Sequence, residues 1–115
     1  PRVLAHLGDA VFSLYVRRQL AQLTPTAKLA LLHQQTSQRV AAKFQAMLLE
    51  TLMSTLTEEE LTLVRRGRNL PLEGGKRNNQ QVHRQATAFE ALLGGLYLAN
   101  LKRLEQVMAQ LNPLL

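Results

Sequence analysis

Apolar residues recur along most of this 115-residue chain at intervals of three and four positions, the spacing that buries one face of an α-helix. The pattern predicts helices over residues 3–23, 26–35, 37–53, 58–66, 80–99 and 101–112. Residues 67–79 contain three Gly, one Pro and three Asn and are predicted to form the only long loop. Because no strand alternation, repeat or linker interrupts this order, we predict one all-α domain of five to six or more helices over residues 1–115.

Capping residues predict where several of these helices begin and end. Thr24, directly before a proline, suits the N-cap of the second helix. Thr57 and Glu60 have the spacing of a capping box, in which each side chain accepts a hydrogen bond from the backbone N–H of the other residue. Gly67 suits a left-handed position just after that helix, and Asn100 is expected to cap the last one.

The first predicted helix is apolar over most of its circumference, so we expect it to be central and buried. Its polar residues form one narrow stripe of Arg2, His6, Asp9, Ser13 and Arg17. Asp9 is the only aspartate in the chain and follows Gly8. A glycine inside a helix costs about 1 kcal/mol relative to alanine, which indicates the close approach of another backbone or a ligand. The structural alternative for Asp9 is a salt bridge to Arg2, Arg17 or a more distant arginine.

The helix predicted over residues 80–99 also carries one acid beside glycines. Its polar stripe contains His83, Thr87, Glu90 and Gly94. A buried carboxylate is costly unless it is paired or bound to a metal, so we expect the two helices to cross and present Asp9 and Glu90 to one cation. Oxygen ligands favour Mg²⁺, with Mn²⁺ as a substitute. His83 and Thr87 are weaker candidates for contacts to substrate or water.

The charge balance indicates an anionic partner. Fourteen Lys and Arg stand against eight Asp and Glu, which gives a formal net charge of +6. Because such side chains displace counterions from phosphates, nucleic acid is the expected partner, and a basic domain without one is the alternative. Only 4% of residues are aromatic, which favours a duplex contacted through its backbone over stacking on single strands. The absence of Cys excludes disulfides and thiolate chemistry, and no segment is apolar over the length of a membrane span.

Positive residues also gather on both sides of the predicted loop. The residues expected to bind the phosphates of a nucleic acid are Arg65, Arg66, Arg68, Asn69, Lys76, Arg77 and Asn78. Arginine presents paired planar donors to phosphate oxygens, and a glycine turn adds backbone N–H groups. The alternative is that Arg65 and Arg66 only complement the helix dipole, which leaves the loop residues unexplained. His6 and His33 have no partner at a metal-binding spacing and are expected to be structural.

Two short motifs resemble those of the ribonuclease III family. Leu7-Gly8-Asp9-Ala10-Val11 resembles the signature helix of that family, and Phe89-Glu90-Ala91-Leu92-Leu93-Gly94 resembles its second metal-binding helix. Further points of similarity are Leu32-His33, Val40-Ala41-Ala42, Gln45-Ala46 and Ala86-Thr87-Ala88. The short length and the stretch Arg65-Arg66-Gly67-Arg68-Asn69 look like the Mini-ribonuclease III branch, and the resemblance covers about residues 4–104.

The larger ribonuclease III enzymes have four acidic positions, and this chain departs from them at two. Ala5 and Thr87 stand where those enzymes carry further acids, so only Asp9 and Glu90 remain. The Mini branch is similar at both positions and is active, so the resemblance still implies a catalytic, metal-binding role for these two acids. It also implies that the chain starts inside the first helices of the family.

The resemblance implies a Mg²⁺-dependent endoribonuclease that acts as a homodimer, with each protomer cutting one strand of double-stranded RNA. The implied role is maturation of the precursor of large-subunit (23S) ribosomal RNA, in a bacterial cytoplasm or a plastid, with neither DNA nor a membrane as partner. The alternative is a non-catalytic RNA-binding protein of the same fold within a ribonucleoprotein. A third hypothesis is a helical protein-interaction module.

Overall fold

The computed structural model describes residues 2–23, 28–71 and 80–115, and these residues form α-helices and short 3₁₀ turns with no strand among them. The helices are α1 (Arg2–Leu23), α2 (Leu29–Val40), α3 (Ala42–Leu52), α4 (Glu58–Arg68), α5 (Gln80–Ala99) and α6 (Leu101–Leu111), and the 3₁₀ turns are η1 (Met53–Thr55) and η3 (Asn112–Leu114). The predicted all-α class is confirmed. In this described part of the chain, no helix has the length and hydropathy needed to cross a membrane.

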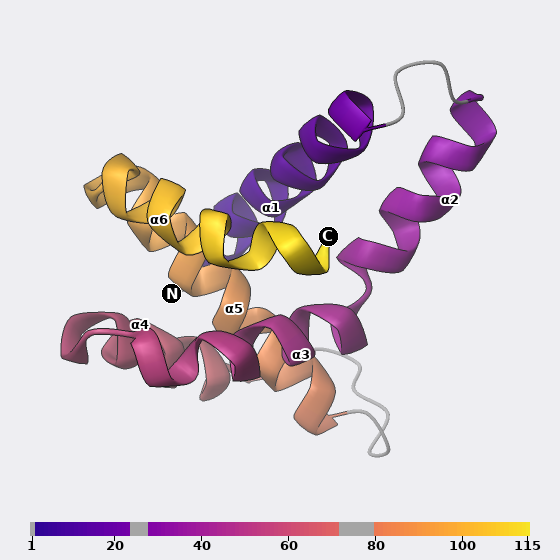
Figure 1. Ribbon diagram of the computed structural model, residues 1–115. Helices are drawn as coiled ribbons and strands as arrows, with labels where there is room; N and C mark the ends of the chain where they lie inside the picture. Colours follow the sequence, from indigo (N-terminus) through magenta and orange to yellow (C-terminus); the bar gives the residue numbers. More distant parts are fainter. Residues whose placement is uncertain (1, 24–27, 72–79) are drawn as a thin grey trace.

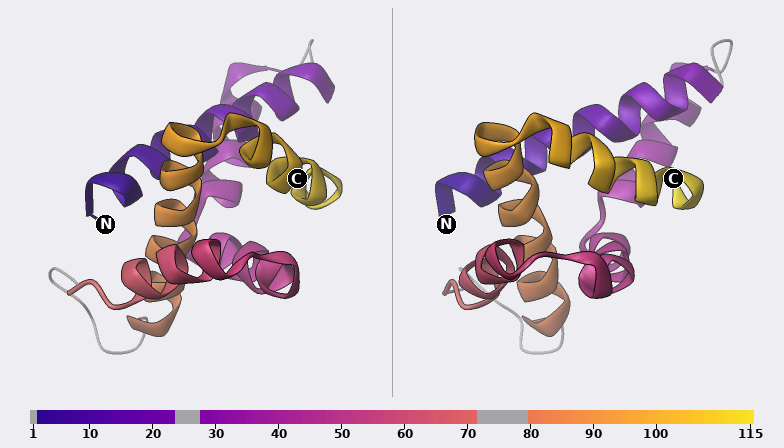
Figure 2. Two further views of the ribbon diagram at one scale, coloured as in Figure 1. Left: turned by 90° about the vertical axis from the view of Figure 1, so that its left-hand side faces the viewer. Right: turned by 60° about the vertical axis from the view of Figure 1, so that its left-hand side comes forward.

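Helix α5 is the centre of the molecule. It packs against α1, α3, α4 and α6, and Figures 1 and 2 show it running between α1 and α6 on one side and α3 and α4 on the other. Its residues from Ala91 to Leu96 are all buried. Phe89 of α5 meets Phe12 of α1 edge to face, with ring centroids 5.1 Å apart. This helix therefore sets the position of every element that packs on it.

The first helix is less buried than its apolar pattern predicted, and the expectation is wrong for one of its apolar sides. Helix α1 buries one face, which includes Val11, Phe12 and Val16, against α5 and the rest of the core. Its opposite face is exposed, and Leu14 there is 64% accessible to solvent. The apolar periodicity identified the helix correctly, but it did not show that one of its apolar sides has no covering element within the described residues.

Several predicted helix ends are confirmed by the hydrogen bonds at them. The Glu60 backbone N–H donates to Thr57 Oγ1 at 3.2 Å, and the Thr57 N–H donates to Glu60 Oε1 at 2.9 Å, so the capping box is present. Asn100 Oδ1 accepts from the Arg103 N–H at 3.0 Å and caps α6. Helices α1 and α5 match their predicted spans to within one residue.

The predicted role of Gly67 as a left-handed stop is wrong, because α4 continues through Arg68. Gly67 lies inside the helix, at its contact with α5. A Cβ at this position would approach Ala88 Cα to 2.8 Å and Ala91 Cβ to 2.9 Å, closer than real carbon contacts allow. The missing side chain therefore serves close packing of two helices rather than an unusual backbone conformation.

The boundary between α2 and α3 also differs from the prediction. The sequence pattern placed it near residue 36, whereas α2 extends to Val40 and the break falls at Ala41, which has extended backbone angles (φ −63°, ψ 145°). The amide of Gln45 caps the C-terminal end of α2, because its Nε2 donates to the Val40 carbonyl at 3.0 Å. The proposed cap at Thr24 lies outside the described residues.

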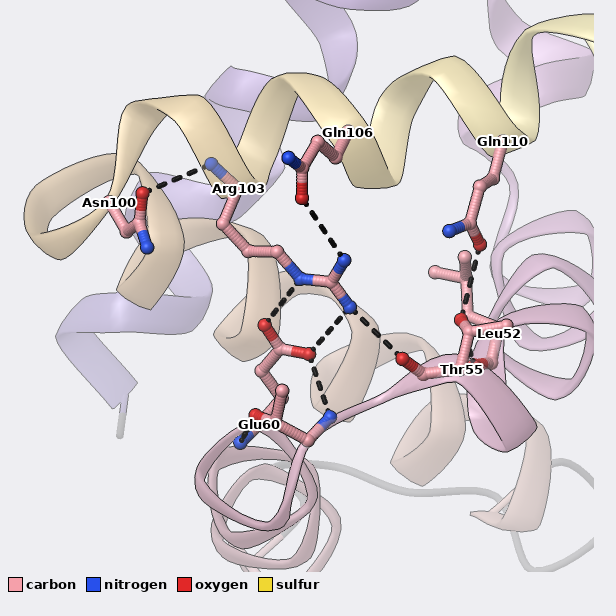
Figure 3. A network of polar contacts seen from close by, with 8 residues as sticks. Leu52, Thr55, Glu60, Asn100, Arg103, Gln106 and Gln110 are labelled. Carbon is pink, nitrogen blue, oxygen red and sulfur yellow. Dashed lines mark hydrogen bonds and ion pairs between the residues drawn. The ribbon is translucent and has the colours of Figure 1, made fainter.

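A mostly buried ion pair joins the start of α4 to α6 (Figure 3). Arg103 donates through Nε to Glu60 Oε2 at 2.7 Å and through Nη2 to Glu60 Oε1 at 2.9 Å. The same Nη2 donates to the Thr55 carbonyl at 3.0 Å. The pair of hydrogen bonds from Arg103 holds the Glu60 pKa below its usual value, since a bound guanidinium favours the ionised carboxylate. These contacts fix the N-terminus of α4 and, through it, the other end of the same helix.

Candidate active site

Helices α1 and α5 cross with their backbones in contact. A Cβ built on Gly8 would overlap the carbonyl group of Glu90, and one built on Gly94 would overlap the carbonyl group of Leu4. Only glycine at both positions allows this separation. The structure therefore gives the reason for a glycine inside α1, and the predicted crossing is present.

The crossing brings Asp9 and Glu90 together, because each acid lies within a turn of a contacting glycine. The Glu90 side chain is half-buried and shares a hydrogen bond with the carboxyl group of Asp9, which is exposed. Burial, followed by this hydrogen bond and the negative charge of Asp9, raises the pKa of Glu90 to about 8. A hydrogen bond from Gln45 acts in the opposite direction. At neutral pH the protonated form of Glu90 is therefore favoured.

These two acids fit a hard divalent cation. A cation placed between them would offset the burial and the repulsion that raise the pKa of Glu90, so proton release and metal binding would be coupled. Among the described residues, no group of three or more His, Cys, Asp or Glu side chains is close enough to surround a metal. A set of two carboxylates suits Mg²⁺, which keeps several waters in its shell, better than a metal that needs a closed cage of protein ligands.

Gln45 is a third polar residue at this crossing, and it was not among the predicted site residues. Gln45 of α3 is only 2% exposed, and its hydrogen bond to Glu90 places its amide beside the acids. It entered the sequence analysis only as part of a point of family similarity, because glutamine is a common surface residue of helices. Its neighbours in the sequence could have indicated that it is buried, because Leu48, Leu49 and Leu52 on the same helix are apolar and buried.

The predicted phosphate-binding residues that the structure describes lie at the end of α4. Arg65 and Arg66 are exposed in its last turn, Arg68 is partly exposed, and Asn69 is the exposed C-cap. Gly67 sits among them against Ala88 and Ala91 of α5, so the end of α4 rests beside the segment that carries Glu90. Lys76, Arg77 and Asn78 lie outside the described residues.

Arg84, which the sequence analysis did not single out, holds this end of α4 in place. Its Nη1 donates to the carbonyl of Arg68 at 3.1 Å and to that of Leu70 at 3.3 Å. The last carbonyls of a helix lack partners within the helix, and a guanidinium from a neighbouring helix is well suited to satisfy them. Arg84 therefore ties the arginine-bearing end of α4 to α5.

The weaker candidates from the same stripe of α5 make no direct contact with the acids among the hydrogen bonds of the described residues. Thr87 Oγ1 donates to the His83 carbonyl at 2.9 Å, which satisfies the hydroxyl within its own helix. His83 is exposed. His6 and His33 are exposed as well, and no ion pair joins Asp9 to Arg17 in the described part of the chain. The observed partner of Asp9 is thus the second acid rather than that arginine.

The Ribonuclease III domain family matches residues 2–101, which include both acids and the end of α4. A crystal structure of a protein from Fusobacterium nucleatum has the same fold, with a TM-score of 0.83 and 25% identity over 94% of this chain and 88% of that one. The helical fold and the paired acids at its centre thus define a ribonuclease III domain.

Close relatives narrow this assignment to one branch. The Mini-ribonuclease 3 of Thermosynechococcus vestitus is 43% identical over 107 residues, covering 93% of this chain and 70% of that protein. The Mini-ribonuclease 3 of Brevibacillus brevis is 45% identical over 112 residues, covering 96% of this chain and 83% of that protein. The chain therefore belongs to the Mini-ribonuclease 3 family and is an endoribonuclease of the ribonuclease III type.

Proposed function

We propose that this endoribonuclease cleaves double-stranded RNA with the help of Mg²⁺ held by Asp9 and Glu90. The observation that carries the proposal is the meeting of these two carboxyl groups at the glycine crossing of α1 and α5. Mn²⁺ is expected to replace Mg²⁺, since both accept oxygen ligands. The family resemblance adds the precursor of 23S ribosomal RNA as the proposed natural substrate.

Asp9 and Glu90 have different parts in the proposed reaction. When bound, Mg²⁺ supplies stabilisation of the negative charge on the scissile phosphate and makes a water molecule more acidic. Asp9 is exposed, whereas Glu90 is partly buried and accepts a hydrogen bond from Gln45. Glu90 would release its proton when it holds the cation, because its ionised carboxylate is the form that binds a metal.

The surface of the protein favours a duplex bound through its phosphates. Arg65 and Arg66 are exposed at the end of α4, where their guanidinium groups can pair with phosphate oxygens. Phe12 and Phe89 are fully buried in the core and are unavailable for stacking on bases. Recognition of A-form RNA depends mainly on shape, phosphates and 2′-hydroxyl groups, which suits a surface of this kind.

Cleavage of a defined RNA duplex with and without Mg²⁺ tests the proposal. We expect Asp9→Asn to lower the single-turnover rate at least about a hundredfold, because it removes one of the two charges that bind the cation. Glu59→Gln, at an exposed acid in the first turn of α4, is the matched control and should cleave normally. A wild-type rate in Asp9→Asn, with an unchanged metal requirement, would show that the assigned role is wrong. Salt-sensitive duplex binding without turnover by the wild type would instead favour the non-catalytic alternative.

We also propose that the protein acts as a homodimer through the exposed apolar face of α1 and its neighbours. This face, called the apolar face below, is defined by the exposed side chains of Leu14, Tyr97 and Leu101. Leu14, Tyr97 and Leu101 line one continuous groove, together with Arg18 and Glu105. The last two have opposite charges and lie 4.0 Å apart, so the same surface can meet a copy of itself without repulsion. An apolar face that continues from the helix bearing Asp9 also fits an enzyme in which two sites act on one duplex.

A further inference from the structure

Gln45 contacts Glu90, one of the two acids of the proposed metal site, and the role assigned to it below rests on that site. Gln45 lies near the start of α3, is 2% exposed, and is one of three buried polar or charged residues among the described positions. Its Nε2 carries two hydrogens. One is donated to the carbonyl of Val40 at 3.0 Å, and Glu90 accepts a hydrogen bond from the same side chain.

The orientation of this amide lowers the stability of the fold, because it leaves the amide oxygen without a partner among the described residues. Gln45 Oε1 is buried and accepts no hydrogen bond from any described residue. A buried acceptor without a partner typically costs about 1–3 kcal/mol. A methionine of similar length would fill the same space without this loss. Packing alone therefore does not account for a glutamine here, whereas the hydrogen bonds that its amide donates to the Val40 carbonyl and to the Glu90 carboxylate do.

The bond to Val40 gives the amide a fixed position. Val40 is the last residue of α2, and the chain turns at Ala41 before α3 begins. Because Nε2 is held by this carbonyl, its second hydrogen has a set direction, and a carboxylate that accepts it loses the freedom to rotate. Partners of this kind orient metal ligands, and their removal typically weakens metal binding or activity about 10- to 100-fold.

We propose that Gln45 is a positioning residue of the active site, which holds the Glu90 carboxylate in the orientation that binds the divalent cation by linking it to the junction of α2 and α3. Gln45 does not itself touch the reacting phosphate. It acts through Glu90, and its effect is on the affinity for the cation and the rate that depends on it.

Binding of Mn²⁺ to the full chain without RNA, measured by isothermal titration calorimetry and electron paramagnetic resonance, tests the proposal. We expect Gln45→Met to bind Mn²⁺ about 10- to 100-fold more weakly than the wild type. Thr36→Val is the matched control, because Thr36 is also buried and donates to a backbone carbonyl, that of Leu32 at 2.8 Å, within α2. This control should keep the wild-type affinity. Wild-type affinity in a folded Gln45→Met protein overturns the proposal.

Two further measurements keep the outcome decisive. Should Gln45→Met fail to fold, Gln45→Asn retains a polar amide but is one methylene shorter, and it should weaken Mn²⁺ binding severalfold; unchanged binding overturns the proposal. In the absence of metal, melting temperatures of Gln45→Met, Glu90→Gln and the double variant report on the contact itself. Non-additive shifts support the link between Gln45 and Glu90, and additive shifts refute it. A wild type that binds no Mn²⁺ but shows non-additive shifts would refute the metal site while supporting this link.

Discussion

Glu90 combines a proposed role in binding the cation with a cost in the stability of the fold. Its side chain is half-buried against another acid, and its pKa is raised to about 8 by burial and by Asp9. The folded protein thus holds this proton more tightly than the unfolded chain does, whose glutamates have pKa values near 4.5. For a carboxyl group with a raised pKa, stability is highest below the unfolded value and falls as pH rises toward the folded value.

Glu90→Gln should therefore stabilise the metal-free protein above pH 8. The wild type loses stability between about pH 4.5 and 8, on the order of 1–2 kcal/mol after allowance for solvent screening of a partly exposed group. The amide does not ionise and removes this loss. Thermal unfolding in EDTA at a series of pH values checks the prediction, and equal melting temperatures of the two proteins at pH 9 would contradict it.

At the same scale, the bond between Arg103 and Glu60 contributes stability that depends on pH in the other direction. The pKa of Glu60 is lowered by Arg103, so its contribution is present above the unfolded pKa and is lost as pH falls through the folded value.

Arg103→Met should cost about 2–4 kcal/mol at pH 7, because it leaves the Glu60 carboxylate buried without its partner. Urea unfolding at pH 7 and pH 3 measures this cost. We expect the difference between wild type and variant to shrink at pH 3, because the stabilisation by this ion pair is lost as pH falls through the lowered pKa of Glu60. Lys102→Met, at an exposed neighbouring position of α6, is the control and should unfold like the wild type at both pH values.

At the scale of the elements, glycines set how closely the helices approach. Gly8 and Gly94 meet backbone carbonyls of the opposite helix, and backbone cannot move aside as a side chain can. Gly95, which follows Gly94 in α5, meets only the Leu63 side chain, whose Cδ1 would lie 2.8 Å from an added Cβ. The three positions therefore differ in what an added methyl group displaces.

Gly8→Ala should destabilise the protein by about 3 kcal/mol or more and reduce cleavage, since α1 must move away from α5 and carry Asp9 with it. Gly95→Ala is the matched control and should cost less, because Leu63 can change its rotamer. Melting temperature and single-turnover cleavage of both variants provide the comparison. A Gly8→Ala protein as stable and active as Gly95→Ala would show that the crossing does not require glycine.

The crossing of α1 and α5 could be predicted from the sequence because the residues that indicate it lie close together within each helix. An acid beside a glycine inside an apolar helix is unusual, and the two cases pointed to one contact. The place of α5 at the centre, and the open side of α1 at Leu14, depend on which helices pack together and could not be obtained from periodicity. Gln45 was missed for the same reason, since its burial is created by tertiary neighbours.

At the scale of the whole molecule, the apolar face stands out because no described part of the same chain covers it. Large exposed apolar residues from α1, the end of α5 and the start of α6 gather there. Soluble monomers rarely expose a broad continuous apolar patch, so a symmetric partner is the simplest cover.

Leu14→Lys should convert the protein from a dimer to a monomer, because it places a charge in the middle of the apolar face. Light scattering coupled to size-exclusion chromatography gives the mass directly. Leu31→Lys, at an exposed leucine of α2 outside this face, is the control and should remain dimeric. A wild type with the mass of one chain would refute the proposed dimer.

The contact of Gly67 with α5 has a consequence for where the enzyme cuts. The arginine-bearing end of α4 rests on Ala88 and Ala91, the residues on either side of Phe89 and Glu90. If these arginines hold phosphates and Glu90 holds the cation, as proposed, one short stretch of helix would set the offset along the duplex between the bound phosphates and the cleaved bond. The enzyme would then cut at a fixed distance from the phosphates that it holds.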